Sequence, residues 1–212
     1  YCITDLEHNI KYSMNEKDEF IAASIYKLPL AMLYYDKVNE GEYTLDSTFT
    51  YSGYMHEDAG VISSDYGIGS QVPLSDLLND LIIYSDNDAG HILYENLGGW
   101  KEYKEAMTKY TDSISENYYT MDNVTTANTM NDVVTYLYDH QEDYKGLIKN
   151  MEKAEPGEYL DRDTQLSMPQ KYGMYDYALN SVGFVECNTS YSIVVLTSLG
   201  DKGADVMANI NR

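Results

Sequence analysis

The sequence predicts a mixed α/β fold in which strands from both ends of the chain form one sheet and the middle is helical. Residues 1–14 and the last fifth of the chain contain short runs of alternating or β-branched residues, which are typical of strands. Between them, apolar residues recur at helical spacing. No repeat or low-complexity linker interrupts the 212 residues. The length therefore fits a single domain, residues 1–212, with two lobes.

The individual elements follow from the same patterns. Two strands are expected at residues 1–6 and 10–14. Residues 20–39 contain a helix that is rich in apolar residues on all sides, which is typical of a buried central helix, and Ser24 is expected at the start of a helix. Residues 42–72 look irregular. Further helices are expected at residues 73–83, 88–97, 100–110, 126–138 and 143–151. Strands at 166–174, 179–186 and 190–199 precede a closing helix at 201–210, which Asp201 is expected to cap. We therefore expect a sheet lobe from residues 1–45 and 145–212 and a helical lobe from residues 46–144.

The charge of the chain restricts its partners. The sequence contains 14 Lys and Arg residues and 35 Asp and Glu residues, which gives a formal net charge of −21. Such a surface repels phosphate backbones and anionic headgroups, so we expect no nucleic-acid partner. No apolar run is long enough to span a bilayer, so no integral membrane segment is expected. The first residues read as a strand and not as an export signal, so the targeting segment of an exported protein would lie outside this sequence.

Cysteine and histidine patterns favour no metal site. Cys2 and Cys187 lack ligand spacing and read as two isolated thiols, although a disulfide, or a lipid on Cys2, is an alternative that the flanking residues do not support. The four histidines are scattered, at positions 8, 56, 91 and 140. We therefore expect neither a metal, nor a cofactor, nor a Ser-His-Asp triad. The 23 tyrosines are read mainly as packing residues in place of phenylalanine, of which there are three.

The first catalytic candidates are Ser24 and Lys27, in the pattern Ser-x-x-Lys. A serine hydroxyl becomes a nucleophile when a base takes its proton. Lys27 lies about one helical turn after Ser24 and can act as that base when burial and a second cation lower its pKa. The pattern alone is weak, because a capping serine with a solvated lysine looks the same. Its position within an apolar segment, where a charge is costly without partners, favours the catalytic interpretation.

Two further motifs follow in the chain. In Ser85-Asp86-Asn87, Ser85 would pass a proton to the leaving group and Asn87 would orient a substrate amide, although the same cluster also suits a turn. In Lys171-Tyr172-Gly173, Lys171 supplies a second cation and a positive spot for a substrate carboxylate. Gly173 allows close approach of a substrate to the strand. The amide of Met174, with that of Ser24, would form an oxyanion hole.

The three motifs in this order resemble the S-x-x-K, S-D-N and K-T-G signature of class A β-lactamases and penicillin-binding proteins. The segments at residues 22–29, 40–46, 73–87, 97–99, 180–185 and 191–197 are similar to the same family, so the resemblance covers nearly the whole chain. It implies a β-lactamase-like fold with an antiparallel sheet of about five strands, helices on both faces and an all-helical lobe. It also implies an extracytoplasmic bacterial monomer that acts on a β-lactam or a peptidoglycan stem peptide.

Two departures from the family pattern bear on function. The interval between Ser85 and Lys171 is short by about one loop, and the deacylating glutamate of the β-lactamases has no clear counterpart. Glu116 is a weak candidate, Asp112 and Asp122 are shorter, and the alternative for Glu116 is a solvated loop residue. Tyr172 replaces the usual Thr or Ser, and neither arginine matches a carboxylate-binding pattern, so recognition of a penicillin carboxylate is expected to be weaker.

Two functions therefore remain open from the sequence. The first is an acyl-enzyme-forming serine hydrolase with slow deacylation. The second is a degenerate domain that binds cell-wall peptides or a protein partner in a groove paved by Tyr26, Tyr84, Tyr172 and Tyr175. The retention of all the polar motif residues favours the enzyme.

Overall fold

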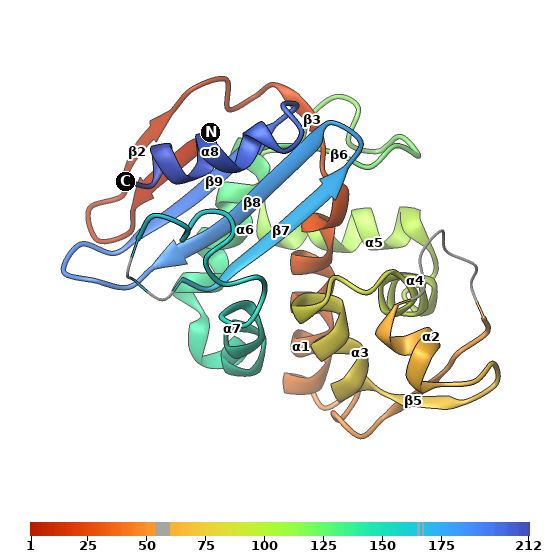
Figure 1. The fold of residues 1–212 in the computed structure, drawn as a ribbon. Helices are drawn as coiled ribbons and strands as arrows, with labels where there is room; N and C mark the ends of the chain where they lie inside the picture. Colours follow the sequence, from red (N-terminus) through yellow and green to blue (C-terminus); the bar gives the residue numbers. More distant parts are fainter. Residues whose placement is uncertain (54–59, 165, 167) are drawn as a thin grey trace.

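Strands from the two ends of the chain form a five-stranded antiparallel sheet in the order β2-β1-β9-β8-β7 (Figure 1). The structure is a computed structural model that describes residues 1–53, 60–164, 166 and 168–212. The strands are β1 (Cys2–Asp5), β2 (Ile10–Ser13), β7 (Gln170–Tyr175), β8 (Ala178–Val185) and β9 (Tyr191–Thr197). The first strand pairs with β9, with Ile3 opposite Ile193. The sheet predicted from the sequence is thus confirmed.

Alternate residues of β8 and β9 face opposite sides of the sheet, as the period of a strand requires. Val182 and Val194 belong to the main core, which also contains α1 and α6 side chains. Val185 and Ile193 pack instead with Met207 of α8 (Lys202–Ile210) in a second, smaller core. Figure 1 shows α8 on one face of the sheet and α6 on the other. Both faces are therefore covered by helices.

The middle of the chain is mainly helical. After the 3₁₀ helix η1 (Ala23–Tyr26), the helices are α1 (Lys27–Asn39), α2 (Val61–Asp65), α3 (Leu74–Ile83), α4 (Asn87–Asn96), α5 (Trp100–Met107), η2 (Thr108–Tyr110), α6 (Ala127–Asp139), η3 (Gln141–Tyr144) and α7 (Lys145–Met151). Two strand pairs lie outside the main sheet, β3 (Glu19–Ile21) with β6 (Val124–Thr126) and β4 (Thr48–Thr50) with β5 (Gln71–Pro73).

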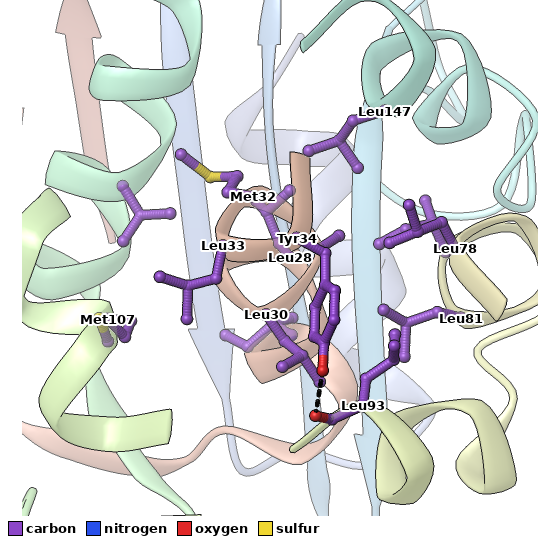
Figure 2. Close-up of a cluster of buried hydrophobic side chains, with 14 of the residues drawn as sticks. Leu28, Leu30, Met32, Leu33, Tyr34, Leu78, Leu81, Leu93, Met107 and Leu147 are labelled. Carbon is purple, nitrogen blue, oxygen red and sulfur yellow. Dashed lines mark hydrogen bonds between the residues drawn. The ribbon is translucent and has the colours of Figure 1, made fainter. Parts of the chain in front are cut away.

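Helix α1 is the centre of the main core. Its residues from Lys27 to Tyr34 are all buried, as expected of a segment that is apolar on every side. Side chains from α3, α4, α5 and α7 surround it (Figure 2). The Tyr34 hydroxyl donates a hydrogen bond of 2.7 Å to the carbonyl of Leu93, which satisfies a polar group in this apolar setting. The N-terminal half of α1 is therefore held firmly by the core.

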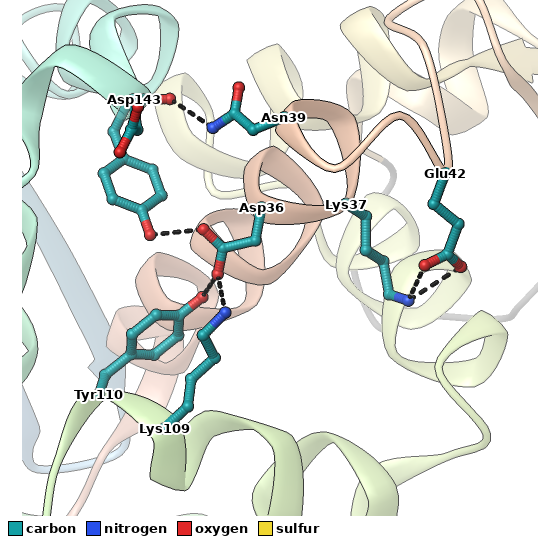
Figure 3. A network of polar contacts seen from close by, with 8 residues as sticks. Asp36, Lys37, Asn39, Glu42, Lys109, Tyr110 and Asp143 are labelled. Atoms are coloured by element: carbon teal, nitrogen blue, oxygen red, sulfur yellow. Dashed lines mark hydrogen bonds and ion pairs between the residues drawn. The ribbon is translucent and has the colours of Figure 1, made fainter.

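The other end of α1 is held by a polar network around Asp36 (Figure 3). Its carboxylate accepts hydrogen bonds from the hydroxyls of Tyr110 and Tyr144, the latter at 2.6 Å. Lys109 forms an ion pair with it at 2.6 Å. Both tyrosines are buried, so one carboxylate serves as the acceptor for two buried hydroxyls.

Several boundaries differ from the prediction. Residues 20–39 do not form one helix, because residues 19–21 pair with β6 and residues 23–26 form a 3₁₀ turn before α1 begins. Ser24 therefore lies on η1 and not at the start of an α-helix. Asp201 precedes α8 but its side chain makes no capping hydrogen bond, whereas Thr126 does cap α6 by accepting from the amide of Thr129. Strand pairing outweighed helix propensity at residues 19–21.

Both cysteines are free thiols, Cys2 buried in β1 and Cys187 exposed beyond β8. Over the described ranges, no helix is long and apolar enough to cross a membrane.

Candidate active site

Ser24 lies on a strained turn that two neighbouring segments hold in place through hydrogen bonds. Ala23, just before it, has a φ of 51°, a left-handed conformation that costs a non-glycine residue roughly 1–3 kcal/mol. The side chain of Asn123 donates to the carbonyl of Ala23 at 2.9 Å, and its own carbonyl accepts from the amide of Ala22 at 2.8 Å. From β8, Asn180 donates to the carbonyls of residues 21 and 22, the latter at 3.1 Å. These contacts fix the backbone on which the nucleophile candidate stands.

Strand β7 passes this turn so closely that only glycine fits at position 173. A Cβ on Gly173 would lie 2.6 Å from the amide nitrogen of Ser24 and 2.8 Å from that of Ile25. Both of these atoms belong to the backbone and cannot rotate away. The sequence analysis predicted close approach of a substrate at Gly173, and in the structure the segment that approaches Gly173 is η1.

Lys27 is completely buried and joins η1 to the Ser85 motif. Its amine donates to the carbonyl oxygen of Ser85 at 2.5 Å and to the side-chain oxygen of Asn87 at 2.7 Å. The hydroxyl of Ser85 lies 3.4 Å away. Burial lowers the pKa of Lys27 to about 7, although the charge of Asp86 acts in the opposite direction. Half of these amines are therefore neutral near pH 7, as a general base requires.

Asp86 builds the loop that presents Ser85 and Asn87. Its buried carboxylate caps α4 by accepting from the amide of Ala89 at 2.8 Å, and it also accepts from the amide of Ile62 at 3.1 Å. Ser85 has a φ of 56°, so the loop is strained at the residue that faces the Lys27 amine. Asp86 thus anchors this loop to α4 and to the backbone of Ile62.

Lys171 is also completely buried, and its neighbours differ from those expected. Its amine donates to the carbonyl of Tyr172 at 3.0 Å and lies 4.2 Å from the centre of the Tyr172 ring. Burial and the charge of Lys27 hold the pKa of Lys171 well below its usual value, and Glu155 acts in the opposite direction. The Tyr172 ring in turn stacks on Tyr159 with 4.9 Å between the ring centres. The expected open positive spot is thus covered by an aromatic ring.

A cavity of about 520 Å³ opens beside Ser24. Its walls come from η1 with the preceding strand, from the loop before β6, from Asn87 and from the end of β7. The lining residues are Ile21, Ala23, Ser24, Tyr26, Asn87, Asp122, Asn123, Val124, Met174 and Tyr175. Of the predicted site residues, Ser24, Asn87 and Met174 line this cavity directly. Lys27 and Ser85 connect to it through Asn87.

The weak candidate Glu116 lies elsewhere. It is exposed and lines a separate cavity of about 470 Å³ with Lys17 and Glu19. Among the described lining residues of the Ser24 cavity, Asp122 is the one that carries a carboxylate. Of the four tyrosines expected to pave a groove, Tyr26 and Tyr175 line the Ser24 cavity, whereas Tyr84 lines a neighbouring one.

A residue that the sequence analysis did not identify, Lys104 of α5, holds the loop that forms one wall of the cavity. Its buried amine donates to the carbonyls of Tyr118, Thr120 and Asp122, at 2.5, 2.8 and 2.6 Å. It also lies 5.3 Å from the ring centre of Trp100. Lys104 falls four residues after Trp100 and three before Met107, on the apolar face of α5, and this spacing is the signal that could have revealed it.

No cluster of His, Cys, Asp and Glu that could hold a metal occurs in the part of the chain that the structure describes. His8, His91 and His140 lie far apart in the chain, and His56 falls outside the described residues.

Comparison with known proteins places these features in a family. A family model described as the beta-lactamase enzyme family matches residues 1–212. A β-lactamase from Chitinophaga pinensis is 22% identical, with a TM-score of 0.84 over 100% of this chain and 90% of that one. PBP-A is 17% identical, with a TM-score of 0.86 over 100% and 86%, and a point mutant of PBP-A is an acyl-enzyme complex with penicillin G. The TLA-1 extended-spectrum β-lactamase is 20% identical, with a TM-score of 0.83 over 99% and 87%. At these identities the solved structures establish a shared fold.

Proposed function

Because the chain belongs to the β-lactamase enzyme family, we propose that it is a serine acyl-transfer enzyme that forms an acyl-enzyme at Ser24. Its substrates would be β-lactams or peptidoglycan stem peptides of the D-Ala-D-Ala type. The observation that supports this most is the buried amine of Lys27, whose pKa is about 7 and whose hydrogen bonds reach Ser85 and Asn87. Titratable groups whose pKa is strongly shifted by burial cluster at functional sites, which favours a catalytic role for this lysine.

In the proposed acylation, a proton passes from Ser24 to Lys27 and returns through Ser85. Neutral Lys27 takes the proton of Ser24, whose oxygen attacks the substrate carbonyl. The amides of Ser24 and Met174 stabilise the resulting oxyanion. Lys27 then returns the proton through Ser85 to the leaving nitrogen as the carbon–nitrogen bond breaks. In the described structure, the hydrogen bonds of Lys27 go to Ser85 and Asn87 and not to Ser24, so the first transfer requires the amine to turn toward the nucleophile.

We expect deacylation to be slow. Hydrolysis of the acyl-enzyme needs a base that activates water on the open side of the ester. Glu116 lines a different cavity from Ser24. Asp122 is exposed, and its side chain is shorter than that of a glutamate. The acyl-enzyme would therefore accumulate, which is the behaviour of a penicillin-binding enzyme. Substrates of this class lie outside the cytoplasm, so we expect the protein to act there.

Intact-mass measurement after incubation with benzylpenicillin tests the proposal. We expect an adduct of the full mass of penicillin on the wild type and none on Ser24→Ala. Ser198→Ala, which removes an exposed serine that does not line the cavity, is the matched control and should be labelled like the wild type. A chromogenic cephalosporin then measures turnover, which we expect to be slow after a single burst.

A second candidate is a binding domain without catalysis, which the exposed ring of Tyr175 at the cavity favours. It predicts no adduct with any β-lactam or acyl-D-Ala ester. It also predicts that calorimetry would still detect binding of a stem peptide by Ser24→Ala.

A further inference from the structure

Lys171 does not line the Ser24 cavity, and an aromatic pair covers it. The Lys171 side chain has 0% exposure, and the Tyr172 ring lies over its amine with 4.2 Å to the ring centre. The ring of Tyr159 stacks on the Tyr172 ring, with 4.9 Å between the ring centres and an interplanar angle of 21°. A carboxylate that bound Lys171 would have to displace a ring held on both sides, and so would lose a cation–π contact and a stacking contact.

The surrounding charges also disfavour a bound carboxylate. Glu155 already acts on both Lys171 and Tyr172 as the nearby negative charge. The two arginines of the chain are engaged elsewhere, Arg162 with Asp205 at 2.8 Å and Arg212 with Asp163 at 2.6 Å. The whole chain carries a formal charge of −21, which repels an anionic ligand more than a neutral one.

The lining of the Ser24 cavity includes an apolar surface that is partly open to solvent. Ile21, Met174 and Tyr175 line it with exposed fractions of 44%, 59% and 62%. An apolar or aromatic acyl group placed there would cover this surface and gain the free energy of its burial. The cavity thus offers contacts to the acyl group, whereas the region around Lys171 offers none to a free anion.

From the covered Lys171 and the apolar lining of the cavity we infer that the site prefers acyl donors with an apolar acyl group and no free carboxylate beside the scissile bond, such as neutral esters and amides. This inference rests on the proposed acylation of Ser24 and changes the preferred substrate: the carboxylate of a β-lactam or a D-Ala-D-Ala peptide would add nothing to the rate of acylation. With a neutral ester, the Ser24 oxygen bonds to the acyl carbon and the bond from that carbon to the alcohol oxygen breaks. The proton of Ser24 leaves on the alcohol.

A matched pair of substrates provides the test, namely benzylpenicillin and its methyl ester. The two differ only in the carboxylate, so the ratio of their acylation efficiencies isolates its contribution within one protein sample. We expect the wild type to be acylated by the ester at least as fast as by the free acid. Tyr172→Thr removes the ring and supplies a short hydroxyl, and it should shift the ratio toward the acid about tenfold, the effect of one charge-assisted hydrogen bond. Tyr172→Phe retains the ring and should retain the wild-type ratio.

The outcomes separate the two proposals. A wild type that is labelled at Ser24 but prefers the free acid tenfold would overturn the inference and leave the acylation mechanism intact. An unchanged ratio in Tyr172→Thr would also overturn it. If neither compound labels Ser24, both the inference and the proposed function fail. Loss of folding in a variant would lower both rates together, and the wild-type ratio decides the question even then.

Discussion

Gly173→Ala tests the contact between β7 and the Ser24 turn. The added Cβ would lie 2.6 Å from the Ser24 nitrogen, and an ordinary contact begins at 3.4 Å, so the strand and η1 must separate by about 0.8 Å. Oxyanion-hole donors act at about 2.7–3.1 Å, so a shift of this size removes most of the contribution of one donor. We therefore expect acylation to slow by about 10²–10³-fold. The free energy of unfolding should fall by about 1–3 kcal/mol through overpacking.

The measurement is the second-order rate of acylation by benzylpenicillin, followed by intact mass, together with urea denaturation. Gly67→Ala is the matched control, because its Cβ would meet nothing closer than 4.0 Å and its φ is not in the left-handed region. It should change neither quantity. A Gly173→Ala protein that acylates within threefold of the wild type would show that the amide at this strand does not contribute to the oxyanion hole.

Three further predictions concern buried charges. Since Lys27 must be neutral to act and its pKa is about 7, the neutral fraction rises from about a tenth at pH 6 to about nine-tenths at pH 8. Acylation of Ser24 should rise about ninefold over that range, and a flat profile would exclude Lys27 as the base. Lys104→Met leaves three loop carbonyls without their donor and should lower the free energy of unfolding by about 2–4 kcal/mol. Lys101→Met, at an exposed i,i+4 ion pair, should change it by less than about 0.5 kcal/mol. Asp36→Ala deprives two buried tyrosine hydroxyls of their acceptor and should cost about 2–4 kcal/mol. Urea denaturation measures all three variants, and equal losses in the two lysine variants would contradict the role of Lys104.

Much of the architecture could be predicted because strand and helix periods are local properties. The β-branched run in β9 and the apolar run from Leu28 to Leu33 in α1 can each be recognised in the sequence. The two ends of the chain have to meet for the terminal strands to be paired. The start of α1 was predicted wrongly because a contact between distant segments determines it. Residues 19–21 pair with residues 124–126, about a hundred positions away, and no local pattern reports such a partner.

In the candidate site, too, local motifs could be predicted and contacts between distant segments could not. Sequence motifs identified Ser24, Lys27, Ser85 and Asn87, and the structure brings these residues together because each motif lies at the end of a rigid element. The covering of Lys171 by Tyr172 could not be predicted, since it depends on a χ angle and on Tyr159 in another segment. Asn123 and Asn180 were missed for a related reason. Their side chains bond to backbone carbonyls far away in the sequence, and no local residue pattern marks such a contact.

The pairing of β1 with β9 bears on how the chain acquires its structure. Ile3 and Ile193 meet directly, so the central strands of the sheet cannot associate until almost the whole polypeptide is available. Such distant pairings slow folding, because the chain loses the entropy of closing a large loop before the stabilising contacts form. A nascent or truncated chain that lacked β9 would expose the unsatisfied edge of β1 and would be prone to aggregation.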